Sequence, residues 1–324
     1  MISGTRYLLV FDFDGTAFDT FEPNSKGIGV HEAYRLAVKD IFGEKGVQIY
    51  DDCGGLKNRA PEEIVYSILN EDKTLLGQAE SCFDSHCKTL RRLVPEGKGA
   101  PLEWVASDNG RLQKTIAEML VLIKLSYLMD EIGSRLEDDC MWPRPCKGFI
   151  QLLNAVRELR SEGIDVQCAI ISSGHELFIR RTFESWGYDL PPIVLSDDDM
   201  RGKTYPVDFK QRVKPSPYLF DLVQAEWISE GILFSSYARH IEMFRESRQR
   251  MIYFGDDLSK DGELAKNAGV PFGLFDPKQK IFERPDNQSF VFQDWGKVAD
   301  FLRHEDIRER LRAGEVTASF IPLL

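Results

Sequence analysis

The sequence predicts an α/β fold, a doubly wound parallel sheet, with an α-helical domain inserted into it. Short apolar runs alternate with amphipathic helical patterns over much of the chain, which is typical of a parallel sheet covered by helices on both faces. About 130 residues separate the first apolar run from the second, far more than one crossover connection needs. A second domain is therefore expected between them.

The expected strands are short apolar runs, most of which are separated from the next by a helical pattern. Helical patterns at 149–163 and 176–187 flank the second run, as an alternation of strands and helices in a parallel sheet requires. The runs lie at 7–13, 166–173, 192–196, 250–257, 271–276 and 289–294, and the last two are weaker.

The long interval after the first strand has a helical character. The segment 23–143 contains helical patterns and almost no strand pattern, so it is expected to be the α-helical domain. The α/β core then consists of residues 1–22 and 144–324. Within the insertion, the apolar stretch 119–129 is short and contains Lys124, which favours a buried helix over a membrane span.

Charge and composition narrow the classes of partner. The chain has 41 Lys and Arg residues against 52 Asp and Glu residues, and its formal net charge is −11. This charge argues against non-specific binding of nucleic acid or of an anionic membrane. The N-terminal residues fit neither a signal nor a transit peptide, and the six cysteines form no CxxC pair. We expect a cytoplasmic protein with free thiols, a monomer or homodimer, that acts on a small molecule.

Polar side chains follow three of the expected strands at the point where each strand ends. In open parallel sheets, ligands bind beyond the carboxyl ends of the strands, so these side chains should meet in one crevice. The residues are Asp12 and Asp14, then Ser172 and Ser173, then Asp256 and Asp257.

The spacing of the first two aspartates suits a reaction centre. If the strand geometry persists, Asp12 and Asp14 point to the same side, ~6.6 Å apart, as a nucleophile and a general acid/base would. Together with Asp256, Asp257 and Asp261 they form a carboxylate cluster that cannot remain ionised without a cation. Oxygen ligands select a hard ion, and Mg²⁺ is the common solution.

The residues beside this pair can assist an anion. Gly15 allows a sharp turn that brings backbone N–H groups near a bound anion. Thr16 and Ser172 can add hydroxyl donors.

Four stretches carry a family resemblance. LVFDFDGT, AIISSG, KPSP and YFGDDLSKDGELAKNAGV resemble, in that order, the four signature motifs of the haloacid dehalogenase (HAD) superfamily of hydrolases. The resemblance extends from the first strand to at least Gly269, and the helical insertion resembles the helical cap of that superfamily. It implies a Rossmann-like core with an inserted cap domain.

The resemblance also implies roles in catalysis. Asp12 would attack phosphorus and become an aspartyl phosphate, while Asp14 would protonate the leaving oxygen and then activate water. Ser172 would bind a phosphoryl oxygen, and Lys214 would neutralise charge on the nucleophile and the phosphate. Lys203 is the alternative lysine, because its surroundings, SDDDMRGKTYP, resemble the usual lead-in to the lysine in that superfamily. We favour Lys214 because a helix is expected to begin there.

The implied metal ligands are the Asp12 carboxylate, the Asp14 carbonyl and Asp256. Asp257 or Asp261 would complete the site, because Asp261 stands one residue later than in the commonest form of the motif. The choice between these two residues stays open here.

Further candidates would contact the substrate. These candidates are Ser173 and Gly174 in the second motif, and Gly15 and Thr16 in the first. In the insertion, the Gly-rich loop 54–63 carries Lys57 and Arg59, which would either reach a second anionic group of the substrate or be solvated surface charges.

Two nearby features are expected to be structural. The acidic run 197–199 is expected to be a solvated loop between a strand and a helix. His175 is expected to be an exposed loop residue.

These observations together predict a Mg²⁺-dependent phosphatase for a small phosphorylated metabolite, since a large cap would exclude bulky partners. Asp14 disfavours dehalogenation, because displacing halide needs no general acid. A phosphomutase, a phosphonate hydrolase using a cap lysine, or a noncatalytic binding protein with the same fold are the alternatives.

Overall fold

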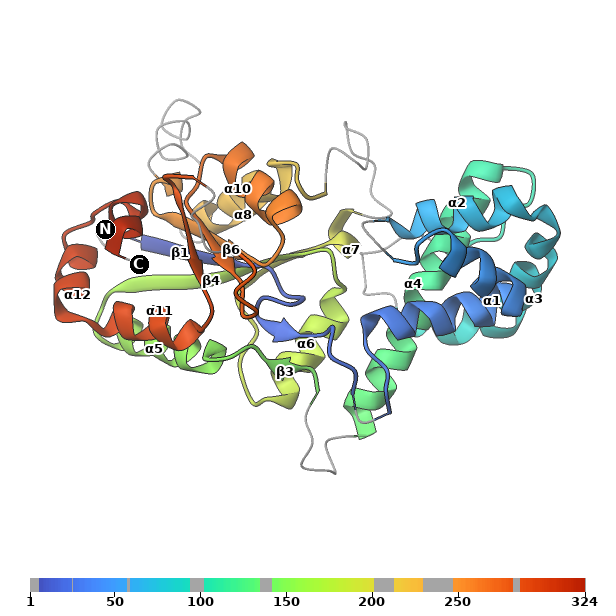
Figure 1. Ribbon diagram of the computed structural model, residues 1–324, viewed down its shortest axis with the longest axis horizontal. Helices are drawn as coiled ribbons and strands as arrows, with labels where there is room; N and C mark the ends of the chain where they lie inside the picture. The colour runs from blue at the N-terminus through green and yellow to red at the C-terminus, as the bar shows by residue number, and fades with distance from the viewer. Residues whose placement is uncertain are drawn as a thin grey trace.

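The computed structural model describes residues 6–24, 26–56, 59–93, 102–134, 142–200, 213–229, 247–281 and 286–323. The predicted α/β class is confirmed: a parallel sheet is flanked by helices, and a helical unit lies to one side of it (Figure 1). The helices are α1 (Val30–Asp52), α2 (Pro61–Glu71), α3 (Leu76–Leu90), α4 (Asn109–Ser134), α5 (Phe149–Ser161), α6 (Glu176–Ser185), α7 (Asp197–Met200), α8 (Tyr218–Ser229), α10 (Glu263–Ala268), α11 (Trp295–Arg303) and α12 (Glu305–Arg312), with short turns η1 (Lys73–Leu75), η2 (Arg91–Leu93), η4 (Leu258–Gly262) and η5 (Thr317–Leu323).

The main sheet has six strands in the order β5-β4-β1-β6-β7-β8, and every neighbouring pair is parallel. Each strand lies within one of the predicted runs or begins one residue before it. The first strand sits at the centre, where its residue Phe11 is paired with Ile170 on one side and Phe254 on the other. The strands are β1 (Arg6–Phe11), β4 (Asp165–Ser172), β5 (Ile193–Ser196), β6 (Met251–Gly255), β7 (Phe272–Phe275) and β8 (Ser289–Phe292).

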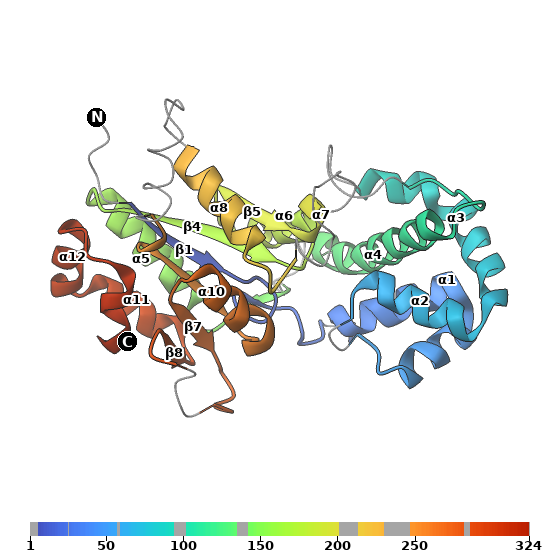
Figure 2. The same cartoon turned by 90° about the horizontal axis from the view of Figure 1, so that it is seen from above.

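The two faces of β1 bury alternate side chains in two different layers, as strand geometry requires. Tyr7, Leu9 and Phe11 belong to the apolar cluster formed with α5, α6, α11 and α12. Leu8 and Val10 belong to the cluster formed with α8 and α10. Figure 1 shows α8 and α10 above the sheet and α5, α6 and α11 below it, and Figure 2 views the molecule from the side of α8 and α10. Both faces of the strand are therefore apolar, and its polar residues lie only at its end.

Aromatic packing under the sheet also anchors the segment that follows β1. Phe11, Phe254 and Trp295 form one ring cluster, with centroids 5.0–5.4 Å from the tryptophan. The indole N–H of Trp295 donates to the carbonyl of Thr16 (2.9 Å). The helix α11 therefore holds the turn that carries the candidate site residues.

A second, separate apolar cluster lies within the helical unit, by which we mean α1 to α4. Helix α4 connects the two parts: its residues from Leu112 to Ile123 pack in the helical unit, and Leu125 and Leu128 pack in the core cluster of β1. The stretch 119–129 is mainly buried, as expected of an interior helix. Among the described residues, no helix is both long and apolar enough to cross a membrane. The domain boundaries stay a prediction.

A short antiparallel ribbon marks where the chain leaves the core and returns to it. Strand β2 (Phe18–Asp19) pairs with β3 (Arg144–Pro145), and the N–H of Cys146 donates to the carbonyl of Ala17 (2.9 Å). The insertion thus begins and ends at adjacent points, which allows a large helical unit without disturbing the sheet. The described cysteines are free thiols.

We expect Gly148→Ala to destabilise the protein much more than Gly163→Ala. Both glycines have left-handed φ angles, 79° and 82°, so both alanines cost ~1 kcal/mol in backbone strain. A Cβ at Gly148 would also overlap the backbone of Gly296, whereas nothing lies within 4 Å of one at Gly163. Overpacking adds ~2 kcal/mol at Gly148. Denaturant unfolding measures both variants, and equal losses would contradict this packing.

Candidate active site

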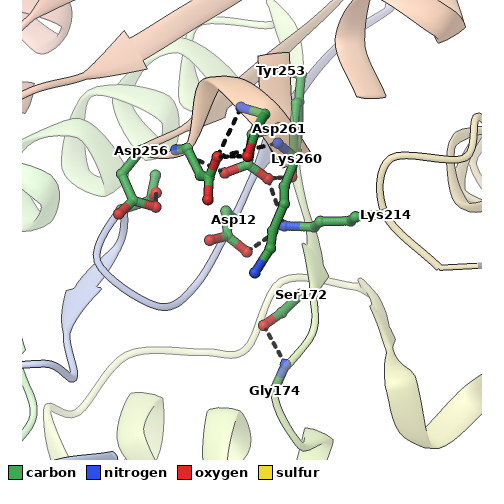
Figure 3. Close-up of polar contacts among 11 residues, drawn as sticks. Asp12, Ser172, Gly174, Lys214, Tyr253, Asp256, Lys260 and Asp261 are labelled. Atoms are coloured by element: carbon green, nitrogen blue, oxygen red, sulfur yellow. Dashed lines mark hydrogen bonds and ion pairs between the residues drawn. The ribbon is translucent and has the colours of Figure 1, made fainter. Parts of the chain in front are cut away.

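Asp12 follows strand β1 directly and stands at the centre of the site. Its N–H donates to the carbonyl of Phe254 in the neighbouring strand β6 (2.8 Å). The Lys214 ammonium donates to Asp12 Oδ1 (2.5 Å) and to Asp261 Oδ1 (2.8 Å), and Figure 3 shows these side chains pointing toward one another. One lysine thus joins two carboxylates that are remote in sequence. Lys203, the alternative lysine, lies outside the described residues.

Three carboxylates gather here in a form that suits a cation. Oxygen atoms of Asp12, Asp256 and Asp261 lie within 4.8 Å of one another. Thr16 Oγ1 donates to Asp256 Oδ1 (3.2 Å) and orients it. A side chain at Gly255 would overlap the Asp261 carboxyl group, so glycine is needed for this close approach. An all-oxygen donor set of this kind fits Mg²⁺.

The electrostatics of the cluster favour a bound cation. Burial raises the pKa of Asp12 well above its usual range; Lys214 opposes this shift, and the Asp261 and Asp256 carboxylates add to it. Burial and Asp261 raise the pKa of Asp256 to about 7. Burial alone would lower the pKa of Lys214, but Asp12 and Asp261 outweigh it and raise that pKa. One ammonium among three carboxylates leaves excess negative charge, which a bound cation would neutralise.

The structure places Asp257 and Asp261, the two alternatives for the last metal ligand, in different roles. Asp257 Oδ1 accepts hydrogen bonds from the N–H groups of Ser259 (2.8 Å) and Lys260 (3.2 Å) and from Ser259 Oγ (2.6 Å). Although burial opposes it, these bonds lower the pKa of Asp257. Asp261 is only 2% exposed and faces Lys214. The geometry therefore places Asp261, and not Asp257, in the carboxylate cluster that could hold a cation.

The turn η4 explains how Asp261 reaches the cluster although it stands one residue late in the motif. The N–H groups of Asp261 (2.7 Å) and Gly262 (3.2 Å) both donate to the carbonyl of Asp257. This is a π-helical turn, which holds one residue more than an α-helical turn. The extra residue is accommodated in the turn, and the Asp261 carboxylate still returns to the site.

Asp14 lies in a turn and not on a strand. Strand β1 ends at Phe11, and the chain turns at Gly15, whose φ is 75° and whose N–H donates to the carbonyl of Phe18 (2.8 Å). Ideal strand spacing therefore does not apply to the two aspartates. Thr20 Oγ1 donates to Asp14 Oδ1 (2.6 Å) and fixes that carboxylate.

Gly174 is the point where the first and second motifs meet. A Cβ there would lie 3.1 Å from Asp14 Oδ2 and equally far from Ser172 Oγ. The buried Ser172 hydroxyl accepts a hydrogen bond from the Gly174 N–H (2.8 Å), as Figure 3 shows, while Ser173 is exposed. The structure thus brings Asp14 and Ser172 close together.

The cationic candidates of the helical unit are less central. Lys57 lies outside the described residues. Arg59 donates to the carbonyl of Cys53 (3.0 Å) and to Ser67 Oγ (2.9 Å), so it holds the loop between α1 and α2 in place. Its contact with a substrate stays a prediction.

Tyr253 belongs to the site although no motif marks it. Its hydroxyl donates to Asp261 Oδ1 (2.8 Å), and the Lys214 ammonium lies 5.6 Å from its ring centroid. Burial, together with Asp261, raises the pKa of Tyr253, so the hydroxyl keeps its proton and remains a donor. In the sequence it is simply one aromatic residue of a buried strand.

The expectations for His175 and for the run 197–199 are wrong. His175 is 3% exposed, and its Nδ1 lies 2.8 Å from Oδ1 of Asp198, which is 4% exposed. Asp198 Oδ2 also accepts from the N–H of Glu176 (2.9 Å), at the start of α6. Parallel strands β4 and β5 bring these residues together. The pair fixes the loop that follows Ser172.

No family model matches the chain, and no curated protein matches it in sequence. It is similar in structure to CbbY from Rhodobacter sphaeroides, solved in complex with phosphate (13% identity, TM-score 0.47, 90% of this chain and 96% of that one). A HAD-hydrolase from Bacillus subtilis, YfnB, solved bound to magnesium, gives 13% identity and a TM-score of 0.40 over 92% and 100% of the two chains.

An L-2-haloacid dehalogenase from Xanthobacter autotrophicus is also similar (14% identity, TM-score 0.41, 93% of this chain and 99% of that one). These similarities concern the fold alone. What this chain does is argued below from its own residues.

We expect Asp261→Asn to weaken Mg²⁺ binding about tenfold or more, because it removes one charge from the oxygen cluster. Asp257→Asn makes the same chemical change on a neighbouring residue and is the matched control. It keeps the cap of η4, because asparagine caps a helix about as well as aspartate, and it should leave both the stability and the affinity nearly unchanged. Calorimetric titration with Mg²⁺ measures both variants; a larger loss of affinity in Asp257→Asn would reverse the assignment.

Proposed function

We propose that the chain is a Mg²⁺-dependent phosphatase that hydrolyses a small phosphorylated metabolite through an aspartyl phosphate on Asp12. One observation carries the proposal: Asp12 is held by Lys214 through a single oxygen, beside an acidic cluster that fits Mg²⁺. Among the described residues, no hydrogen bond reaches its other oxygen, Oδ2. The order of the four motifs supports the same chemistry.

The first half of the reaction is attack by Asp12 on phosphorus. A bond forms between the free carboxylate oxygen and phosphorus, and the bond from phosphorus to the leaving oxygen breaks. Asp14 gives its proton to that oxygen, so the alcohol leaves neutral. The hydrogen bond from Thr20 to Asp14 Oδ1 (2.6 Å) leaves Oδ2 to carry this proton.

The second half restores the enzyme. Asp14, now ionised, takes a proton from a water molecule, whose oxygen attacks phosphorus while the bond to Asp12 breaks. Inorganic phosphate is released, and both aspartates return to their starting states. The same residue thus acts first as an acid and then as a base.

Fixed donors would stabilise the charge that develops on the phosphoryl group. Lys214 would neutralise the nucleophile and one phosphoryl oxygen, and the Ser172 hydroxyl and neighbouring N–H groups would bind others. Asp12, Asp256 and Asp261, with the Asp14 carbonyl, would hold Mg²⁺, which when bound supplies charge neutralisation for the transferring group.

The position of the helical unit supports a small substrate. The strands run toward this unit, so it lies beyond their carboxyl ends and beside the site (Figure 1). A unit there would limit access to small substrates and keep bulk solvent out of the site. We place the protein in the cytoplasm, as a monomer or homodimer, in keeping with its charge and free cysteines.

The proposal is tested with a panel of phosphorylated metabolites, with and without Mg²⁺. We expect hydrolysis that depends on Mg²⁺, and a loss of at least about a thousandfold in kcat for Asp12→Asn, which keeps the shape but removes the nucleophile. Lys214→Ala should lose activity comparably, and Lys203→Ala is its matched control. Robust turnover by Asp12→Asn would exclude the covalent mechanism, and no turnover of any ester by the wild type would favour a binding protein.

A further inference from the structure

Phe21 is an exposed aromatic residue at the edge of the candidate site. Its relative exposure is 45%. Among the described residues, the other large hydrophobic residues that are more than a third exposed are Tyr66 and Val316. Water-exposed phenyl surface is unfavourable, and a preformed site tends to place such surface where a ligand will cover it. The position of Phe21 therefore matters more than its exposure.

The backbone around Phe21 is tied to the core on both sides. The residue before it, Thr20, donates through Oγ1 to Asp14 and accepts from the N–H of Val30 (3.2 Å). The residue after it, Glu22, accepts from the indole N–H of Trp142 (2.9 Å). Phe21 is consequently held in a fixed relation to Asp14, the group proposed to protonate the leaving oxygen.

The ring itself reaches the carboxylate cluster. A Cβ placed at Gly15 would lie 2.7 Å from Phe21 Cε2 and 2.7 Å from Asp256 Oδ2, so both atoms border the same small space. The His31 ring, with its centroid 5.8 Å away, supports the phenyl ring on the side of α1. The Phe21 ring thus adjoins the cation cluster at Asp256, and the neighbouring residue Thr20 holds the proposed general acid, Asp14.

We propose that Phe21 is a specificity-determining residue whose ring packs against a flat, apolar face of the leaving group. This inference rests on the proposed function and names the substrate class: phosphate monoesters of alcohols that carry such a face, of which aryl esters are the simplest. The phosphoryl group occupies the charged cluster, and the organic part of the substrate covers the phenyl ring. Covering one phenyl side chain is worth about tenfold or more in affinity.

The test compares two esters, 1-naphthyl phosphate and glycerol 3-phosphate, on four proteins. Phe21→Ala should raise KM for 1-naphthyl phosphate about tenfold and leave KM for glycerol 3-phosphate within about twofold. Phe21→Tyr keeps the ring and should behave like the wild type. Tyr66→Ala removes an exposed aromatic residue of α2 and should change neither KM.

A binding measurement separates this inference from the proposed function. In an Asp12→Asn background, calorimetry should show the Kd of 1-naphthyl phosphate rising about tenfold when Phe21 is also replaced by Ala. An unchanged Kd and an unchanged ratio of KM values would overturn the role of Phe21 while leaving the phosphatase intact. If the wild type hydrolyses neither ester, the proposed activity fails on these substrates, and the Kd comparison decides the role of Phe21 alone.

Discussion

The ammonium of Lys214, placed between Asp12 and Asp261, is the interaction on which the rest of the site depends. All three side chains are nearly inaccessible to water, and burying charges is costly unless they are paired. A single positive charge cannot satisfy Asp256 as well, and burial leaves the pKa of that residue at about 7. One more positive charge, such as a bound cation, would therefore stabilise the ionised cluster. Removing the lysine would leave Asp12 and Asp261 as unpaired buried carboxylates.

Several uncharged residues serve to keep this arrangement in place. Tyr253 donates to the same oxygen of Asp261 that Lys214 contacts, and the other oxygen, Oδ2, accepts from the N–H of Asp257 (3.3 Å). Thr16 orients Asp256, and its own carbonyl is held by Trp295 from helix α11. The helices that cover the sheet thus do more than bury its faces, because they also fix the turn after β1. Small changes in core packing around Trp295 should accordingly alter the position of the Asp256 carboxylate in the candidate site.

The sequence allowed prediction of the features that depend on local pattern. Continuous apolar runs identified the strands, and parallel pairing then required Asp12 and Asp256 to emerge at one edge of the sheet. Contacts between remote segments left no such pattern: the His175–Asp198 pair joins residues 23 positions apart, and each alone resembles a loop residue. The position of Asp261 beside Lys214 depends on a π-helical turn, and spacing alone does not reveal that turn. Strand spacing for Asp14 failed because β1 ends at Phe11.

The central claim is that Asp12 forms a covalent bond to phosphorus. The most direct measurement is rapid acid quenching during turnover of a substrate, followed by proteolysis and mass spectrometry of the peptides. We predict one added phosphoryl group on the peptide that contains Asp12, and its absence from Asp12→Asn. Phosphate release by the wild type without any phosphoryl group on that peptide, or with the group on another residue, would contradict the account.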